Sequence, residues 1–347
     1  MAKIYKCPGC GGELVYQSGT DQMVCPHCGR TVAVSALEEL INAGQTVGLS
    51  GGAQTDNAGN GIREYHCPAC GAAIVADENT VATFCSFCGN PTLLEERVSG
   101  EFNPSRLIPF QFDKKQAQEK FRQWAKKGRL TPSSFHSQAV MDKVSGVYVP
   151  FWLYSYTTNV ELAGTAAIHH IERQETQEII TTDHYDFHRT VTGDYENVPY
   201  NASASMPDND MQILEPYDYS LLKNFSMPYL SGFFAEKFTY KADELKGQVQ
   251  NALREDIVSA ALGTIAGYDE VNPMMTNVAF ENEKTEYVML PVWTLNYTYK
   301  GQKYPIYMNG ATGKIDGVLP TSKGKTFVMF AIIFVIVFVI AFLLGRA

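Results

Sequence analysis

The sequence predicts an α+β protein with two small four-cysteine zinc-ribbon β-hairpin modules at its N-terminus and one transmembrane helix at its C-terminus. Three observations predict this fold class. All eight cysteines lie within residues 7–88, where they form four CxxC pairs. Residues 98–320 alternate between helical patterns and strand-like runs rich in aromatic and β-branched residues. Residues 327–344 form an uninterrupted apolar stretch of the length that crosses a bilayer.

The cysteines form an internal repeat in which the second set follows the first at a displacement of 60 residues. Each set contains two CxxC turns, and residues 13–24 and 73–84 between them read as a strand, a turn and a strand. Two such turns at the base of a hairpin supply four thiolates to a tetrahedral Zn²⁺ ion. The repeat therefore predicts two structural zinc ions, with these metal ligands: Cys7, Cys10, Cys25, Cys28, Cys67, Cys70, Cys85 and Cys88.

A glycine follows the second cysteine of every pair. We expect it to adopt a positive φ and to point its N–H toward a thiolate sulfur. Because a module of about 30 residues buries too little apolar surface to fold alone, metal binding would supply the folding free energy. Four thiolates leave no open coordination position for catalysis. His27 and His66 lie beside the pairs and are interpreted as bystanders rather than ligands.

The charge balance bears on the function class. The chain has a formal net charge of −9, and residues 1–97 contain five Lys or Arg against ten Asp or Glu. Zinc ribbons elsewhere bind nucleic acid, but an acidic surface is unfavourable for that function, which makes it the first alternative. The second is a metal-dependent enzyme using His184 and His188, although the glutamate of an HExxH site is absent. Since no P-loop or nucleophile pattern is present either, we expect no enzymatic activity.

The apolar stretch 327–344 contains 18 residues without a charge, which as a helix spans about 27 Å. Lys323 and Lys325 precede it and Arg346 follows it. The first ten residues contain no apolar signal-peptide core, and CxxC clusters indicate metal binding in a reducing compartment. We therefore expect a single-pass protein of the cytoplasmic membrane, with residues 327–344 in lipid and the N-terminal bulk in the cytoplasm.

The chain divides into five expected segments: zinc ribbon 1 at 1–34, a flexible linker with a short helical patch at 35–63, zinc ribbon 2 at 64–97, an α+β domain at 98–320 and the membrane anchor at 321–347. Within the α+β domain we expect an entry strand over 99–112 and irregular sequence over 197–227. Three helices are expected, at 113–127 with Asp113 as N-cap, at 132–144 and at 241–262. The last should bury Leu245, Val249, Ala252, Leu253 and Ile257.

A fainter repeat relates Val147–Tyr156 to Val288–Tyr297, displaced by 141 residues. Val, Pro, Trp and Tyr coincide in the two copies, and each copy continues into further strand-like sequence. In the second continuation, 300–302 and 309–310 read as turns. The repeat predicts that the α+β domain contains two related β-units.

These features together resemble bacterial TFIIB-type zinc-ribbon membrane proteins. The resemblance rests on the two ribbons, VYVPFWLY at 147–154, the segment 214–238, the ending LPVW…MNGATGKIDGVLP and the terminal membrane helix. Members are often labelled as relatives of a primosomal helicase, and some in Gram-positive bacteria are encoded beside phage-shock protein A and an SPFH-domain protein. The resemblance implies a membrane-tethered adaptor in envelope-stress response, with those two kinds of protein as partners. The helicase label finds no support, because no nucleotide-binding motif is present.

Overall fold

The computed structural model describes residues 2–42, 48–51, 55–56, 63–76, 79–85, 88–94, 102–174 and 177–345. The chain forms two compact units. Unit 1 comprises Met1–Pro150, Ser203–Phe238 and Val288–Ala347, and unit 2 comprises Phe151–Ala202 and Thr239–Tyr287. The long strands β12 (Ser145–Gln174) and β16 (Glu270–Tyr299) contribute residues to both. The α+β class predicted from sequence is confirmed.

The N-terminal strands of unit 1 lie in three sheets. One path through the largest sheet has the order β15 (Phe234–Glu236), β9 (Thr80–Phe84), β10 (Pro91–Leu94), β1 (Ala2–Tyr5) and β5 (Gly48–Gly51). A second sheet contains β2 (Val15–Gln17), β3 (Gln22–Val24) and β4 (Thr31–Ala33). The third contains β6 (Thr55–Asp56), β7 (Arg63–His66) and β8 (Ala73–Ala76).

The two cysteine modules are therefore built differently. The expected hairpin at 13–24 is confirmed, because β2 pairs antiparallel with β3. The strands expected within 73–84 also form, but their pairing as one hairpin is wrong. Strand β8 pairs with β7, whereas β9 pairs with β10 and β15. The physical reason is that a strand has two hydrogen-bonding edges, and β10 and β15 occupy both edges of β9, which leaves none for β8.

The expected linker contains more regular structure than its composition indicates. The helical patch is confirmed as α1 (Val34–Asn42), which buries Leu37. Residues 48–51 form β5, which pairs antiparallel with β1. Most of the remaining Gly/Asn-rich stretch lies outside the described residues. Within the linker, β5 thus belongs to the same sheet as the first residues of the chain, whereas β6 belongs to the sheet of β7.

The predicted helix at 113–127 is confirmed as α2 (Lys114–Lys126). Asp113 caps it in a capping box with Gln116, and Phe121 and Ala125 are buried. The entry strand is wrong in extent, because among its described residues, 102–112, only Arg106–Leu107 form a strand, β11. Prolines at 104 and 109 flank this strand and lack the N–H that a longer ladder needs.

The expected helix at 132–144 is wrong. This segment forms a 3₁₀ turn, η3 (Ser133–His136), and a single α-helical turn, α3 (Gln138–Met141). Ser137 between them is extended, with φ −66° and ψ 150°, so the two pieces cannot continue as one helix. The irregular sequence expected over 197–227 forms short elements, and its first residues extend strand β13. These elements are α4 (Asp208–Ile213), η4 (Tyr219–Leu221), β14 (Lys223–Asn224) and η5 (Met227–Leu230).

Aromatic side chains form the centre of unit 1. The Phe110 ring stacks on Phe233 with centroids 4.1 Å apart, and both rings meet the Trp293 indole edge to face. Trp293, from the second copy of the faint repeat, is 2% exposed. Strand β16 continues into β17 (Gln302–Asn309) through the predicted turn, where Lys300 and Gly301 have positive φ. Strand β17 then pairs with β18 (Ile315–Gly317).

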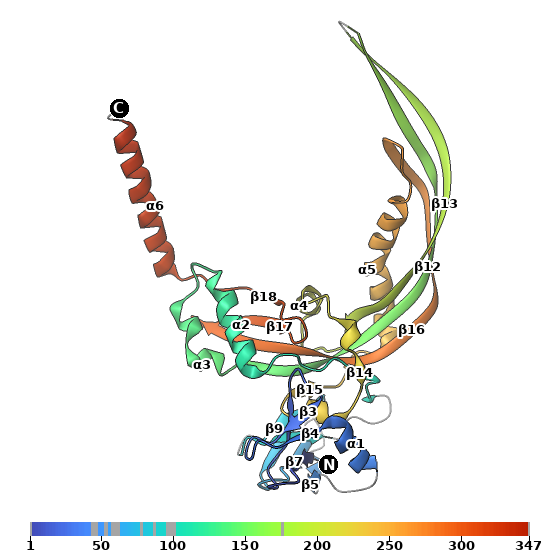
Figure 1. The fold of residues 1–347 in the computed structure, drawn as a ribbon. Coiled ribbons are helices and arrows are strands. Elements are labelled where there is room, and N and C mark those ends of the chain that lie inside the picture. Colours follow the sequence, from blue (N-terminus) through green and yellow to red (C-terminus); the bar gives the residue numbers. More distant parts are fainter. Residues whose placement is uncertain are drawn as a thin grey trace. The chain divides into compact units, whose positions relative to one another are not determined.

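Unit 2 is a sheet with one helix packed on it. Strand β12 pairs antiparallel with β13 (Gln177–Asn201) over almost the whole length of β13. Helix α5 (Ala242–Leu262) lies alongside these strands and β16 (Figure 1). Its Ile257 and Ala261 share a core with Val160 and Val278. The predicted helix at 241–262 is confirmed, except that Ala252 is exposed rather than buried.

Both copies of the faint repeat lie in long strands, as predicted, and each is followed by an antiparallel strand. The partners differ in size, since β13 has 25 residues and β17 has 8.

The final element is the helix α6 (Lys323–Leu344), whose most apolar 18-residue window has a mean hydropathy of 3.4. No residue of that window is buried. The helix is long and apolar enough to cross a membrane. Arg346 lies outside the described residues.

Candidate metal centres

The first four-cysteine group lies where strands β1 to β4 begin and end. Cys7 and Cys10 follow β1, and Cys25 and Cys28 connect β3 to β4. The sulfurs of Cys7 and Cys28 are 3.6 Å apart, and those of Cys10 and Cys25 are 3.5 Å apart. All four sulfurs lie within 4.8 Å of one another. This site is named centre 1.

The second group, centre 2, has the same arrangement. The Cys67 and Cys88 sulfurs are 3.7 Å apart, as are those of Cys70 and Cys85. A tetrahedral Zn²⁺ with metal–sulfur bonds of about 2.3 Å needs sulfurs about 3.8 Å apart. Both centres match this spacing, and the sulfurs are too far apart for disulfides. Each centre can therefore hold one zinc ion in a closed, four-thiolate site.

The same backbone turn positions all four CxxC pairs. The glycine after each second cysteine has a φ between 71° and 74°: Gly11, Gly29, Gly71 and Gly89. The positive φ predicted from sequence is confirmed, but the expected direction of the glycine N–H is wrong. Each of these N–H groups donates to the carbonyl of the first cysteine of its pair at 2.9 Å. This bond closes the turn and leaves the sulfurs free to converge.

Burial distinguishes the two cysteines of each pair. The first is buried and the second is exposed in every case. At centre 1 the N–H of Gly9 lies 3.4 Å from the Cys7 sulfur and lowers the pKa of the Cys7 thiol to about 6. The thiolate form of Cys7 is thereby favoured at neutral pH, whereas interactions with the Cys28 and Cys25 side chains raise the pKa of the Cys10 thiol to about 12. At centre 2 burial raises the pKa of the Cys67 thiol.

The histidines singled out from sequence do not join these centres. His27 lies 3.1 Å from the Glu13 carboxylate, and His66 is in β7 opposite Ala73. His184 and His188 lie in β13 as the strand-like sequence predicts, opposite alanines in β12. Within the described parts of the chain, the metal-ligating groups close enough to share an ion are the two cysteine sets.

Centre 1 is joined to the rest of unit 1 by contacts that sequence reasoning missed. The Ser231 hydroxyl donates to the Leu14 carbonyl at 2.8 Å, and the Tyr16 N–H donates to the Ser231 carbonyl at 3.0 Å. The Tyr229 hydroxyl and the Lys223 ammonium both bond the Asp21 carboxylate. The partners are more than 200 residues apart in the chain, so no local pattern could have indicated them.

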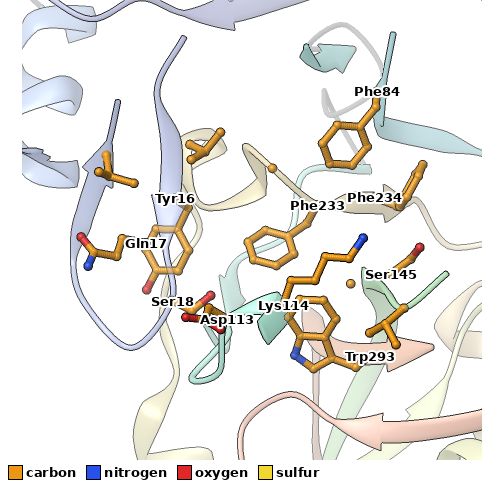
Figure 2. Close-up of a pocket in the computed structure, with 15 residues that line it drawn as sticks. Tyr16, Gln17, Ser18, Phe84, Asp113, Lys114, Ser145, Phe233, Phe234 and Trp293 are labelled. Carbon is orange, nitrogen blue, oxygen red and sulfur yellow. The ribbon is translucent and has the colours of Figure 1, made fainter. Parts of the chain in front are cut away.

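A cavity of about 640 Å³ lies beside this contact (Figure 2). Five rings contribute to its lining, from β2, β9, β15 and β16 and the loop before β15: Tyr16, Phe84, Phe233, Phe234 and Trp293. Lys114 and Ser145 add polar groups. A volume of about 300–1,000 Å³ with apolar walls and a few polar groups is typical of a ligand or side-chain binding pocket. The sequence singled out Trp293 alone of these rings.

Comparison with known proteins gives two matches. Residues 2–33 match the family model of the A2L zinc ribbon domain. The chain is also 35% identical over 333 residues to a protein of Bacillus subtilis (strain 168) named "Uncharacterized protein YdjG", and the alignment covers 95% of this chain and 94% of that protein. No solved structure matches the chain.

Proposed function

The chain belongs to the family of Bacillus subtilis YdjG, and we propose that it is a membrane-tethered zinc-ribbon adaptor that docks cytoplasmic proteins at the membrane. The observation that carries the proposal is the joining, in unit 1, of two closed metal centres with a helix apolar enough to span a bilayer. Closed thiolate centres stabilise a surface and offer no position for a substrate. The proposed role is therefore non-enzymatic.

The proposed topology has a single span, with the bulk of the chain in the cytoplasm. Lys323 and Lys325 at the start of α6 support it, since positively charged residues flank spans on the cytoplasmic side. The eight free cysteines also support it, because a reducing compartment keeps thiolates available for metal.

The proposed docking position is the aromatic pocket beside centre 1. Phe234 is 36% exposed and its ring meets Phe84 edge to face, with centroids 5.1 Å apart. Such a pocket takes an aromatic or aliphatic side chain from a partner, which is the usual energetic centre of a protein interface. The proposed partners are phage-shock protein A-like and SPFH-domain proteins, in an envelope-stress role. This choice, like the TFIIB-type relationship of the ribbons, rests on the resemblance described above.

The test uses the full chain in detergent with purified phage-shock protein A-like and SPFH-domain proteins from the same genome. We expect one of them to bind, and Phe234→Ala to weaken binding at least about fivefold, the effect of losing a contact worth 1 kcal/mol. Tyr240→Ala, which removes an exposed ring outside the pocket, is the matched control and should leave affinity unchanged. Absence of binding by both candidates would refute the proposed partners.

Two other results would redirect the proposal. Salt-dependent binding of DNA or RNA by the full chain would favour the nucleic-acid alternative. Stoichiometric metal beyond two zinc ions per chain, lost on replacing His184 and His188, would favour the metal-dependent enzyme.

A further inference from the structure

The C-terminal half of α2 is basic in a chain that is acidic overall. Residues 120–131 contain five Lys or Arg and no Asp or Glu, whereas the chain as a whole has a net charge of −9. Arg122 has a carboxylate partner, Glu119, at 3.8 Å. Lys126, Lys127 and Arg129 form no ion pair with a described residue. This positive charge therefore has no ion-pair partner among the described residues of unit 1.

Hydrogen bonds fix the start of α6 beside this basic segment. The Ser322 N–H donates to the Leu130 carbonyl at 2.8 Å, and the Lys325 ammonium donates to the Thr131 carbonyl at 2.7 Å. Gly128 permits the approach, since a Cβ there would lie 2.8 Å from the Leu319 side chain. The basic end of α2 is thus held next to the point at which the chain enters its apolar span.

The pKa of the His136 side chain depends on cations from both α2 and α6. Burial lowers the pKa of the His136 imidazole, and the positive charges of Lys325, Lys126 and Arg122 lower it further. These cations come from α2 and from the first turn of α6. The two elements therefore form one positively charged surface.

A cavity of about 400 Å³ lies on the adjoining flank of α2, against the turn between β17 and β18. Lys120, Lys127 and Lys314 line it, together with the Gln123 amide and the Trp124 indole. Lys120 also lies over the Phe112 ring at 4.3 Å, and Lys314 donates to the Glu215 carbonyl. Three ammonium groups around one cavity suit a phosphate, and Trp and Lys are residues enriched near bilayer interfaces.

We propose that this surface, formed by residues 120–131 of α2 and its following loop, Lys314 and the start of α6, binds the phosphate headgroups of anionic phospholipids. The lipids are those of the bilayer that α6 crosses, so the proposal rests on the membrane span of the proposed function. Each basic side chain near an anionic membrane surface strengthens binding about fivefold. The surface would orient unit 1 against the membrane and concentrate anionic lipid around the span.

The test is native mass spectrometry of the full chain, purified in detergent and mixed with equimolar phosphatidylglycerol and phosphatidylcholine. We expect the wild-type chain to retain phosphatidylglycerol preferentially. Lys120→Gln with Lys127→Gln should reduce that preference about 5- to 25-fold, from the loss of one to two full charge contributions. The matched control is Arg254→Gln with Lys284→Gln, two exposed cations of unit 2 that carry the same charge change. Zinc content of two per chain checks that each variant is folded.

Equal retention of both lipids by the wild-type chain, or an equal loss in the control variant, would overturn the proposal. So would an RNA oligonucleotide that binds through Lys120 and Lys127 in preference to the lipid. Carbonate washing of membranes that contain the full chain separates this failure from that of the proposed function. A chain released by the wash has no membrane span, whereas a chain retained without lipid preference lacks only the headgroup surface.

Discussion

Centres 1 and 2 have the same cysteine spacing and the same turn geometry but lie in different surroundings. At centre 1 the CxxC turn of Cys25 connects β3 to β4 within a small sheet of three adjacent strands. At centre 2 the turn of Cys85 follows β9, which pairs with β10 and with β15 from residue 234 onward. The other turn of each centre lies in the opposite kind of sheet, since Cys7 follows β1 of the large sheet and Cys67 lies between β7 and β8 of a small one. The two centres therefore differ in which of their turns belongs to the large sheet.

This difference shows that a metal-binding repeat specifies the geometry of the CxxC turns and not the sheets that surround them. Two CxxC turns and their glycines determine the metal geometry over about 25 residues at both centres. The pairing of the flanking strands is not determined by these turns. Strand β10, which follows the turn of Cys85, is buried along its full length and pairs with β9 on one edge and with β1 on the other. Replacing a ligand in the turn of Cys25 should therefore act first on the small sheet, and replacing one in the turn of Cys85 should act first on the large sheet.

The largest expected effect comes from removing one ligand at each centre. Cys25→Ser and Cys85→Ser should each lower the zinc content from two ions to one per chain and forfeit most of about 10–16 kcal/mol of binding free energy. We expect Cys25→Ser to increase amide hydrogen exchange in β2, β3 and β4. Cys85→Ser should increase it in β9, β10 and β1 as well as at its own turn. Metal analysis and hydrogen-exchange mass spectrometry measure both quantities.

The expected difference between the two centres is contradicted if Cys25→Ser and Cys85→Ser increase hydrogen exchange in the same strands. Protection of β1 and β15 that survives Cys85→Ser would mean that the large sheet does not depend on centre 2. Retention of two zinc ions by either variant would contradict the pairing of the ligands.

A smaller effect should follow from cavities in the cores beside the two centres. Leu14 and Leu94 are both fully buried, and Leu94 packs with Tyr65 and the cysteines Cys67 and Cys85. Replacing either leucine with alanine should cost about 2–5 kcal/mol of unfolding free energy. We expect Leu94→Ala also to weaken zinc binding at centre 2, and Leu14→Ala to leave that centre unchanged. Denaturant unfolding followed with a zinc-release dye measures both.

Matched leucine-to-methionine variants are the controls for the cavity experiment. Methionine conserves most of the volume, so each control should cost less than about 1.5 kcal/mol. Weakening of centre 2 by Leu14→Ala would show that the two cores are coupled, and the pairing of β1 with β10 is the direct connection between them.

Local patterns accounted for the metal centres and for the helices with clear boundaries. The cysteine spacing and the following glycines predicted the turns, because four ligands around one ion leave few arrangements of the backbone. Asp113 as N-cap marked the start of α2, and the apolar run 327–344 marked α6. In each case the residues that determine the structure lie within a few turns of one another.

Long-range pairing accounted for what the sequence did not show. The partner of β9 is β15, some 150 residues away, and neither strand carries a local signal for the other. The contact of Asp21 with Tyr229 and the aromatic pocket beside it depend on the same assembly. The segment 132–144 had a helical composition, but the extended backbone of Ser137 divides it into two short turns.

The smallest expected effect tests whether the CxxC turns that end at Gly29 and Gly89 are equivalent although the sheets around them differ. Gly29 has φ 72° and Gly89 has φ 74°, and a Cβ at either position would meet no atom within 4 Å. Alanine at either site should therefore cost only the strain of the left-handed conformation, about 1–2 kcal/mol. The zinc dissociation constant of the affected centre should rise about 5- to 30-fold in chelator competition, and asparagine, which tolerates this conformation, should cost less. Equal increases in the zinc dissociation constant for the two substitutions would mean that the turns are equivalent and that the centres differ only in the surrounding sheets. A cost at Gly89 larger by more than about 1.4 kcal/mol, a tenfold change in affinity, would mean that the shared sheet already strains the turn of centre 2.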